Sequence, residues 1–228
     1  MLTLRRSGDR GHADHGWLNS YHTFSFAGYY NPDRIHFGAL RVLNDDTVDG
    51  GKGFGKHPHD NMEIISIPLE GDLEHKDSMG NAGSIKGGDV QWMTAGSGVI
   101  HSEGAPESFS KTGGVLHLIQ LWVNLPRSAK MSKPKYQDIP SENIPAIKID
   151  NSTLRLIAGS FADKTGPAET FTPILLMHGI MNAGDKLSMP IPQNFHSSIF
   201  VTKGELSTDG YEIPEQHLVW FNEENQNI

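Results

Sequence analysis

The 228-residue sequence contains no cysteine, so disulfide bonds and thiolate metal ligands are excluded. No apolar stretch approaches the roughly 18 residues of a membrane span, and the Arg5-Arg6 pair is followed by polar residues rather than by a signal-peptide core. Basic residues are in the minority: the formal net charge is −8 and the pI is about 5.8, which argues against nucleic acid or an anionic membrane as a direct partner. These absences predict a soluble, cytoplasmic protein.

The sequence also lacks any long stretch with a sustained helical period of apolar residues. Apolar runs of strand length dominate instead, separated by Gly, Pro, Asn and Asp, and this pattern predicts an all-β fold. The expected strands of a first unit are residues 35–43, 62–69, 73–77, 90–93 and 116–123. Those of a second unit are residues 154–158, 174–178, 186–189, 197–201 and 217–221.

Two pairs of metal-ligating side chains are the main functional signal, and each is interpreted as lying on a further strand of the first unit. His57 and His59 form an HxH pair followed by Glu63, and His101 and Glu103 form an HxE pair. With 12 His in the chain, roughly half an HxH is expected by chance, so spacing alone is weak. Residues i and i+2 of a strand point to the same face, however, so two such strands side by side can close on one metal ion.

The flanking residues connect these pairs to a known family. The glycines before His57 and the turn at residues 94–98 before His101 resemble the two motifs of the cupin superfamily, although His101 falls two residues late and no Asn follows it. A closer resemblance is to the pirin family of double cupins. It rests on Arg10-Gly11-His12, His22-Thr23-Phe24-Ser25-Phe26, His57-Pro58-His59, Asp77-Ser78-Met79-Gly80-Asn81 and Ala95-Gly96-Ser97-Gly98-Val99-Ile100-His101-Ser102-Glu103.

The resemblance implies two cupin-type antiparallel β-barrels, a bicupin, and it is close over residues 1–125 and looser thereafter. We expect a metal-binding domain at 1–125, a proline-containing linker at 126–150 and a metal-free cupin-like domain at 151–228. A diverged internal repeat supports two barrels, because residues 69–73 are echoed by residues 202–206.

The second barrel is expected to be short at its C-terminus. About thirty residues follow Trp92 in the first unit before the expected linker, whereas only eight follow its counterpart Trp220. An unclosed barrel would expose strand edges. Coverage by the N-terminal strand at residues 2–5, coverage by a partner chain and an open barrel are the alternatives, and the resemblance to pirins favours the N-terminal strand.

The ligand chemistry can be argued from the residue types. Three imidazoles and one carboxylate suit Fe(II), Mn, Co, Ni, Cu or Zn, and a six-coordinate ion would keep two positions open. The carboxylate is either Glu63 or Glu103. In the pirin pattern it is Glu103, so we expect the ligands His57, His59, His101 and Glu103 around one divalent ion, Fe(II) first, with Glu63 orienting a ligating His. His75 and Asp77 form a further HxD pair, which we interpret as a surface pair.

The resemblance implies two classes of function. In the first, the protein is a quercetin 2,3-dioxygenase-like oxidoreductase: the metal binds a flavonol, dioxygen adds across the ring and carbon monoxide leaves, with Glu103 or alternatively Glu63 as the catalytic base. In the second, it is a non-enzymatic, iron-binding regulator whose surface responds to the redox state of the iron and binds a partner protein. A metal-dependent isomerase or another cupin enzyme is less favoured, because the carboxylate placement matches pirins better.

Overall fold

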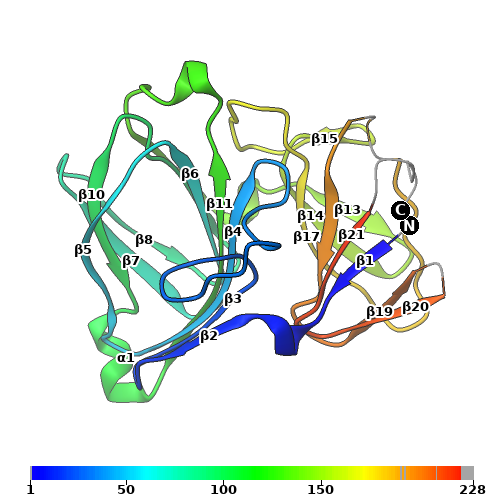
Figure 1. Ribbon diagram of the computed structural model, residues 1–228, viewed down its shortest axis with the longest axis horizontal. Coiled ribbons are helices and arrows are strands. Elements are labelled where there is room, and N and C mark those ends of the chain that lie inside the picture. Colours follow the sequence, from blue (N-terminus) through cyan, green and yellow to red (C-terminus); the bar gives the residue numbers. More distant parts are fainter. Residues whose placement is uncertain (1, 191, 193, 209, 222–228) are drawn as a thin grey trace.

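The computed structural model describes residues 2–190, 192, 194–208 and 210–221, and it is almost entirely β-structure. Two barrels lie side by side (Figure 1). The described residues form one short α-helix, α1 (Glu107–Thr112), and three 3₁₀ turns, η1 (Ser7–Asp9), η2 (Arg127–Ala129) and η3 (Ser141–Asn143).

Two sheets build the first barrel. One has seven strands in the order β12-β9-β6-β11-β4-β3-β2, and the other has four in the order β5-β10-β7-β8. Their bounds are β2 (Gly11–Asp14), β3 (Leu18–His22), β4 (Leu40–Asp49), β5 (Gly53–His59), β6 (Met62–Glu70), β7 (Asp72–Asp77), β8 (Ala82–Lys86), β9 (Val90–Thr94), β10 (Val99–Gly104), β11 (Val115–Asn124) and β12 (Lys135–Ile139).

The centre of the large sheet is buried on both faces, which explains its sequence. On β11, Leu116 and Leu118 pack in the interior of the first barrel, whereas Ile119 and Leu121 belong to a core cluster that also contains Ile157 of the second barrel. A strand with two buried faces reads as a continuous apolar run rather than an alternating one. The two barrels therefore share one core along β6 and β11.

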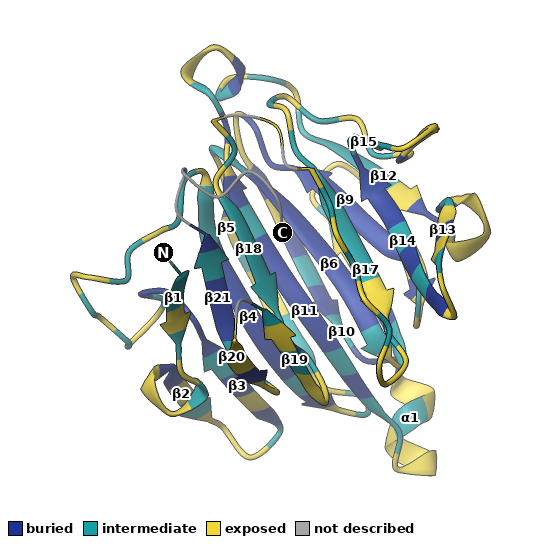
Figure 2. Cartoon of the chain, turned by 90° about the vertical axis from the view of Figure 1, so that its right-hand side faces the viewer, coloured by how far each residue is buried: buried dark blue, intermediate teal, exposed yellow. Residues whose placement is uncertain are grey.

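The second barrel has the same order of strands but is divided. One sheet has the order β1-β21-β18, and another has the order β13-β14-β17. Their bounds are β1 (Leu2–Arg5), β13 (Ala146–Ile149), β14 (Ser152–Ala158), β17 (Leu176–Ile180), β18 (Ser197–Phe200) and β21 (Leu218–Phe221), and two small pairs add β15 (Ser160–Phe161) with β16 (Lys164–Thr165) and β19 (Glu205–Thr208) with β20 (Tyr211–Pro214). Figure 2 shows the two sheets on opposite sides of the barrel.

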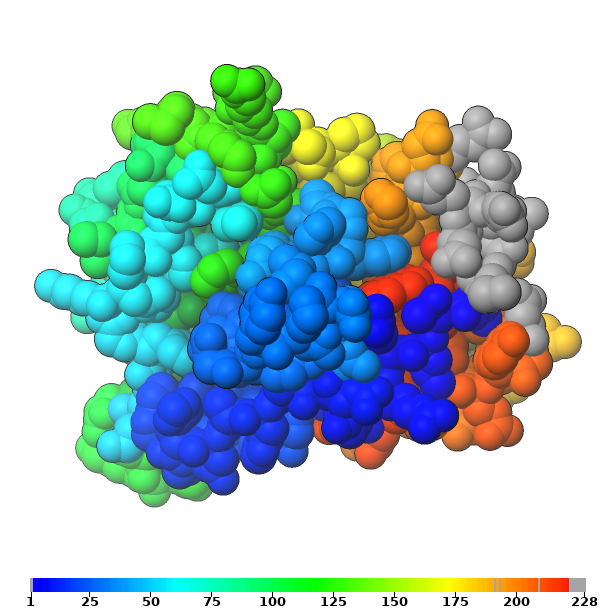
Figure 3. All heavy atoms as spheres, in the orientation of Figure 1, coloured from blue at the N-terminus to red at the C-terminus, as the bar shows by residue number. Residues whose placement is uncertain are grey.

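In the part of the chain that the structure describes, β17 pairs only with β14 and β18 pairs only with β21. Each therefore keeps one free edge. The N-terminal strand β1 joins this barrel, but it pairs with β21 on the side away from these edges. Figure 3 shows the N-terminal segment running across both barrels. The expectation that this strand covers the gap was thus wrong about its position, because β1 extends the far side of the sheet.

Several expected strands are shifted. The strand expected at 35–43 begins at Leu40 and continues to Asp49. Its second half was missed because Asn44 and Asp46 are polar although they are buried. Residues 186–189 form no strand. Within the expected linker, residues 135–139 form β12, which pairs with β9 in the first barrel. No helix of the described residues is long and apolar enough to cross a membrane.

Candidate metal site

Strands β5 and β10 bring three histidines together at one end of the first barrel. The two strands pair antiparallel, with His101 directly opposite His57 and His59 opposite Val99. The ring centroids lie 4.5 Å apart for His57 and His101, 4.7 Å for His57 and His59, and 4.9 Å for His59 and His101. One nitrogen from each ring lies within 4.8 Å of the other two. Within the described residues, this is the group that could hold a metal ion.

A bulge in β5 fixes the orientation of His57. The pairing of β5 with β10 shifts by one residue between His101 and Glu103, and the extra residue falls on β5. Here the carbonyl of Gly55 accepts a hydrogen bond from Nδ1 of His57 at 2.7 Å. Because a carbonyl only accepts, Nδ1 carries the proton and Nε2 keeps its lone pair for a metal.

The donor spacing fits one divalent ion. Nε2 of His57 and Nε2 of His101 are 3.1 Å apart. Two nitrogens each about 2.1 Å from an ion, at right angles to one another, would be about 3.0 Å apart. The donor set, three borderline imidazole nitrogens without sulfur, is one that first-row transition metals accept.

The electrostatics also favour a metal. Burial, with smaller contributions from His101 and His57, lowers the pKa of His59 to about 3. Burial likewise lowers the pKa of His101, although the nearby Glu103 opposes this. His59 and His101 are 8% and 1% exposed, whereas His57 is partly exposed and marks the solvent side of the site. The two buried rings are thus held in the neutral form that binds metal ions.

Glu103 follows His101 by two residues on β10 and is buried. It is not part of the three-histidine group, although its charge acts on the ring of His101. Its Oε1 accepts a hydrogen bond from the amide of Gln120 at 2.8 Å, and the oxygen of Gln120 accepts one from the indole N–H of Trp122 at 2.9 Å. Because an indole only donates, it fixes which end of the Gln120 amide faces the carboxylate. The other carboxylate oxygen, Oε2, is buried without a hydrogen-bond partner in the described structure. A buried oxygen of this kind is expected to have a ligand.

Glu63 lies elsewhere, which corrects the expectation that it orients a ligating histidine. The strand does not continue from His59 to Glu63, because β5 ends at His59 and β6 starts at Met62. Glu63 shares its face of β6 with Ile65, which packs in the core between the barrels. Its Oε1 accepts the indole N–H of Trp92 at 2.9 Å, and burial raises the pKa of its carboxyl. The structure therefore gives Glu63 a place between the barrels rather than at the histidines.

Sequence reasoning missed the supporting residues on β11. Gln120 and Trp122 share a face with Leu116 and Leu118, so the signal was a single glutamine on the interior face of an otherwise apolar strand. The ring of Trp122 also packs edge-on against His59, with centroids 4.7 Å apart.

Two other polar groups of the interior were also missed. His75, interpreted above as a surface residue, is 3% exposed and stacks on Tyr136 with centroids 5.0 Å apart. The hydroxyl of Ser20 links Nε2 of His22 to the carboxyl of Asp46. Burial raises the pKa of Asp46 to about 7, and the negative charge of Glu103 adds to this effect.

Two antiparallel barrels, with a three-histidine cluster at the end of the first alone among the described residues, define a bicupin with one candidate metal centre. The sequence pattern of the pirin family matches residues 3–123. The chain belongs to the pirin family.

Individual proteins that are similar to this chain are consistent with the family assignment. Quercetin 2,3-dioxygenase of Escherichia coli strain K12 is 53% identical over 123 residues, which cover 54% of this chain and 52% of that protein. The match thus spans about half the length of this curated relative. Quercetin 2,3-dioxygenase from Acinetobacter baumannii superposes with a TM-score of 0.87 and 33% identity, over 99% of this chain and 80% of that one. A bacterial pirin from E. coli, solved in complex with nickel(II), superposes with a TM-score of 0.76 and 32% identity, over 100% and 92% of the two chains.

Proposed function

We propose that the protein is a metal-dependent dioxygenase that cleaves a flavonol such as quercetin. His57, His59, His101 and Glu103 hold one divalent ion, for which Fe(II) is the first candidate. The observation that carries the proposal is the convergence of three imidazoles on strands β5 and β10. β10 also carries the buried carboxylate of Glu103, whose Oε2 has no hydrogen-bond partner among the described residues. The names of the E. coli and A. baumannii relatives support the choice of a flavonol.

The surroundings of the histidines suit a flat aromatic substrate. The ring of Trp122 lies edge-on to His59, and Phe26 lies edge-on to Trp122 with centroids 5.3 Å apart. The ring centroid of Phe54 lies 6.4 Å from that of His57. Aromatic walls bury the apolar faces of such a substrate and favour edge-to-face contacts with it.

Each residue then has a part. A divalent ion held here would supply a Lewis acid for a substrate oxygen and redox chemistry for the reaction with dioxygen. The neutral imidazoles of His59 and His101 need no deprotonation to ligate. We assign to Glu103 the role of the base that takes the proton of the flavonol 3-hydroxyl at Oε2, while Gln120 holds its Oε1. This role requires that Glu103 bind the ion weakly or move away from it.

The test is aerobic incubation of the iron-loaded protein with quercetin, following the loss of quercetin's visible absorption and the carbon monoxide released. We expect turnover above that of free iron. His101→Ala removes one of the three nitrogens, so we expect metal affinity to fall more than about 100-fold, beyond the loss usual for an outer-shell partner, and turnover to disappear. His217→Ala, a histidine of the second barrel whose Nδ1 donates to the Glu215 carbonyl, is the matched control.

The outcomes separate the parts of the proposal. Iron binding without loss of quercetin would overturn the flavonol substrate and favour the redox-responsive regulator that binds a partner protein. Turnover that survives His101→Ala would overturn the assignment of the site.

A further inference from the structure

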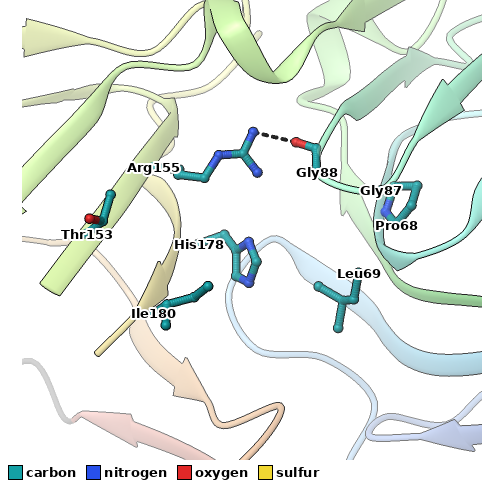
Figure 4. A pocket seen from close by; sticks show the side chains of 8 residues that line it. All are labelled: Pro68, Leu69, Gly87, Gly88, Thr153, Arg155, His178 and Ile180. Atoms are coloured by element: carbon teal, nitrogen blue, oxygen red, sulfur yellow. Dashed lines mark hydrogen bonds between the residues drawn. The ribbon is translucent and has the colours of Figure 1, made fainter. Parts of the chain in front are cut away.

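A cavity of about 280 Å³ lies between the two barrels, on elements that the proposed metal site does not use. Its walls come from both barrels: Pro68, Leu69, Gly87 and Gly88 from the first, and Thr153, Arg155, His178 and Ile180 from the second. Figure 4 shows Arg155 and His178 on one side of the cavity, facing Leu69 and the glycines.

Arg155 lies in this wall without a carboxylate partner among the described residues. It donates one hydrogen bond, to the carbonyl of Gly88, and makes no ion pair within 4.0 Å. The nearest acid, Asp89, is already engaged, because its two oxygens accept the backbone N–H groups of Lys86 and Ser141. Burial lowers the pKa of Arg155, and the charge of Asp89 opposes this only in part.

The other arginine between the barrels has the partner that Arg155 lacks. Arg10 is 8% exposed, lies 3.4 Å from the carboxylate of Asp45 and donates to Gln216 at 3.1 Å. A half-buried guanidinium costs free energy unless an anion accompanies it. The contrast indicates that the counter-ion of Arg155 comes from outside the described part of the chain, and an external anion is the candidate considered next.

Two further donors stand beside Arg155. His178 is its direct partner across β14 and β17, and Nδ1 of His178 is buried without a hydrogen-bond partner. Thr153, two residues before Arg155 on the same face, accepts a hydrogen bond from Lys148 at 2.6 Å, so its own hydroxyl hydrogen remains free to donate. Guanidinium, imidazole and hydroxyl groups together are donors of the kind that bind oxyanions.

We propose that this cavity binds a small organic carboxylate with an apolar body, held by Arg155, His178 and Thr153 between the two barrels. The planar guanidinium matches a carboxylate in two-pronged geometry. The remaining walls are apolar at Pro68, Leu69 and Ile180, which selects against a bare inorganic anion. The assignment is independent of the metal site and of the reaction proposed there.

Titration of the full chain with benzoate, followed by the amide NMR signals of Gly87 and Gly88, tests this. We expect saturable shifts in the wild type, at least tenfold weaker binding in Arg155→Gln, and no change in Lys203→Gln, which removes one positive charge from a turn of the same barrel. Glutamine can still donate to the Gly88 carbonyl, so circular dichroism should show Arg155→Gln folded. If it does not fold, His178→Leu and Thr153→Val carry the same expectation.

No saturable binding of benzoate by the wild type, or equal affinity in Arg155→Gln or its substitutes, would overturn the proposal. Inorganic phosphate is the comparison ligand. Binding of phosphate in preference to benzoate would overturn the choice of an apolar carboxylate.

Discussion

The large sheet of the first barrel is continuous, whereas the corresponding sheet of the second barrel is divided in the part of the chain that the structure describes. In the large sheet of the first barrel the order is β12-β9-β6-β11-β4-β3-β2, and in the second barrel it is β1-β21-β18, then a gap, then β17-β14-β13. By position, each of these six strands of the second barrel has a counterpart in the large sheet of the first, and the strand of that sheet without a counterpart among the described residues is β11. The gap thus falls where the first barrel has its central strand.

The missing counterpart explains why the candidate site belongs to one barrel. β11 makes the large sheet of the first barrel continuous by pairing with both β4 and β6, and it also carries Gln120 and Trp122, which orient Glu103. The strand that completes the sheet is therefore the strand that supports the site. A site held on paired strands keeps its geometry better than one held at a free edge.

The interiors differ as well. The first encloses polar groups such as Asp46 and Gln120, whereas the cluster around Val201, Ile213, Val219 and Phe221 in the second is apolar. Buried polar groups cost stability unless they are satisfied. The first barrel is therefore expected to contribute a dependence of stability on pH through the buried carboxyl group of Asp46.

The largest effect expected is that of Asp46→Asn on the metal-free protein. The carboxyl of Asp46 has its pKa raised from 3.8 to about 7 by burial, so between these values the folded protein holds a proton that the unfolded chain has lost. Its contribution to stability is complete below about pH 4 and is lost as the pH rises through 7. Asparagine cannot ionise. As the pH rises from 5 to 8, the free energy of unfolding of the variant should therefore increase by about 3 kcal/mol relative to that of the wild type.

Urea denaturation at the two pH values measures this difference. Asp163→Asn, at an exposed position of the second barrel, is the control and should show no such change. An equal difference between Asp46→Asn and wild type at both pH values would show that the two interiors do not differ in this respect.

The next effect is that of Gln120→Leu on metal affinity. The change removes the hydrogen-bond donor to Oε1 of Glu103, so the carboxylate is less firmly oriented for the role of ligand proposed above. We expect the affinity for Co(II), titrated by its visible absorption, to fall about 10- to 100-fold. Gln137→Leu on β12, whose amide donates to the Glu169 carbonyl, is the matched control. Unchanged affinity for Co(II) in Gln120→Leu would show that β11 joins β4 and β6 without supporting the metal site.

The sequence predicted the all-β class because strand-length runs and turn residues are local signals, whereas the two barrels were implied by the resemblance to pirins and supported by the internal repeat. It also brought His57, His59 and His101 together, since i and i+2 share a face of a strand. It could not place Glu63, because the chain leaves β5 at His59 and re-enters a different sheet at Met62. Nor could it find the partners of Glu103 on β11, since cross-strand hydrogen bonds depend on register between segments that are distant in sequence.

The smallest effect concerns the far side of the second barrel, where β1 adds a strand to β21. The guanidinium of Arg5 lies 4.3 Å from the ring centre of Trp220, and it donates a hydrogen bond to the Asp33 carbonyl at 3.3 Å. Arg5→Ala should therefore cost about 0.5–1 kcal/mol, measured by urea denaturation, while the affinity for Co(II) stays unchanged. Arg6→Ala, at an exposed neighbouring position, should change neither quantity. A loss of metal affinity in Arg5→Ala would mean that the second barrel holds the geometry of the first, because no contact of Arg5 reaches the histidines.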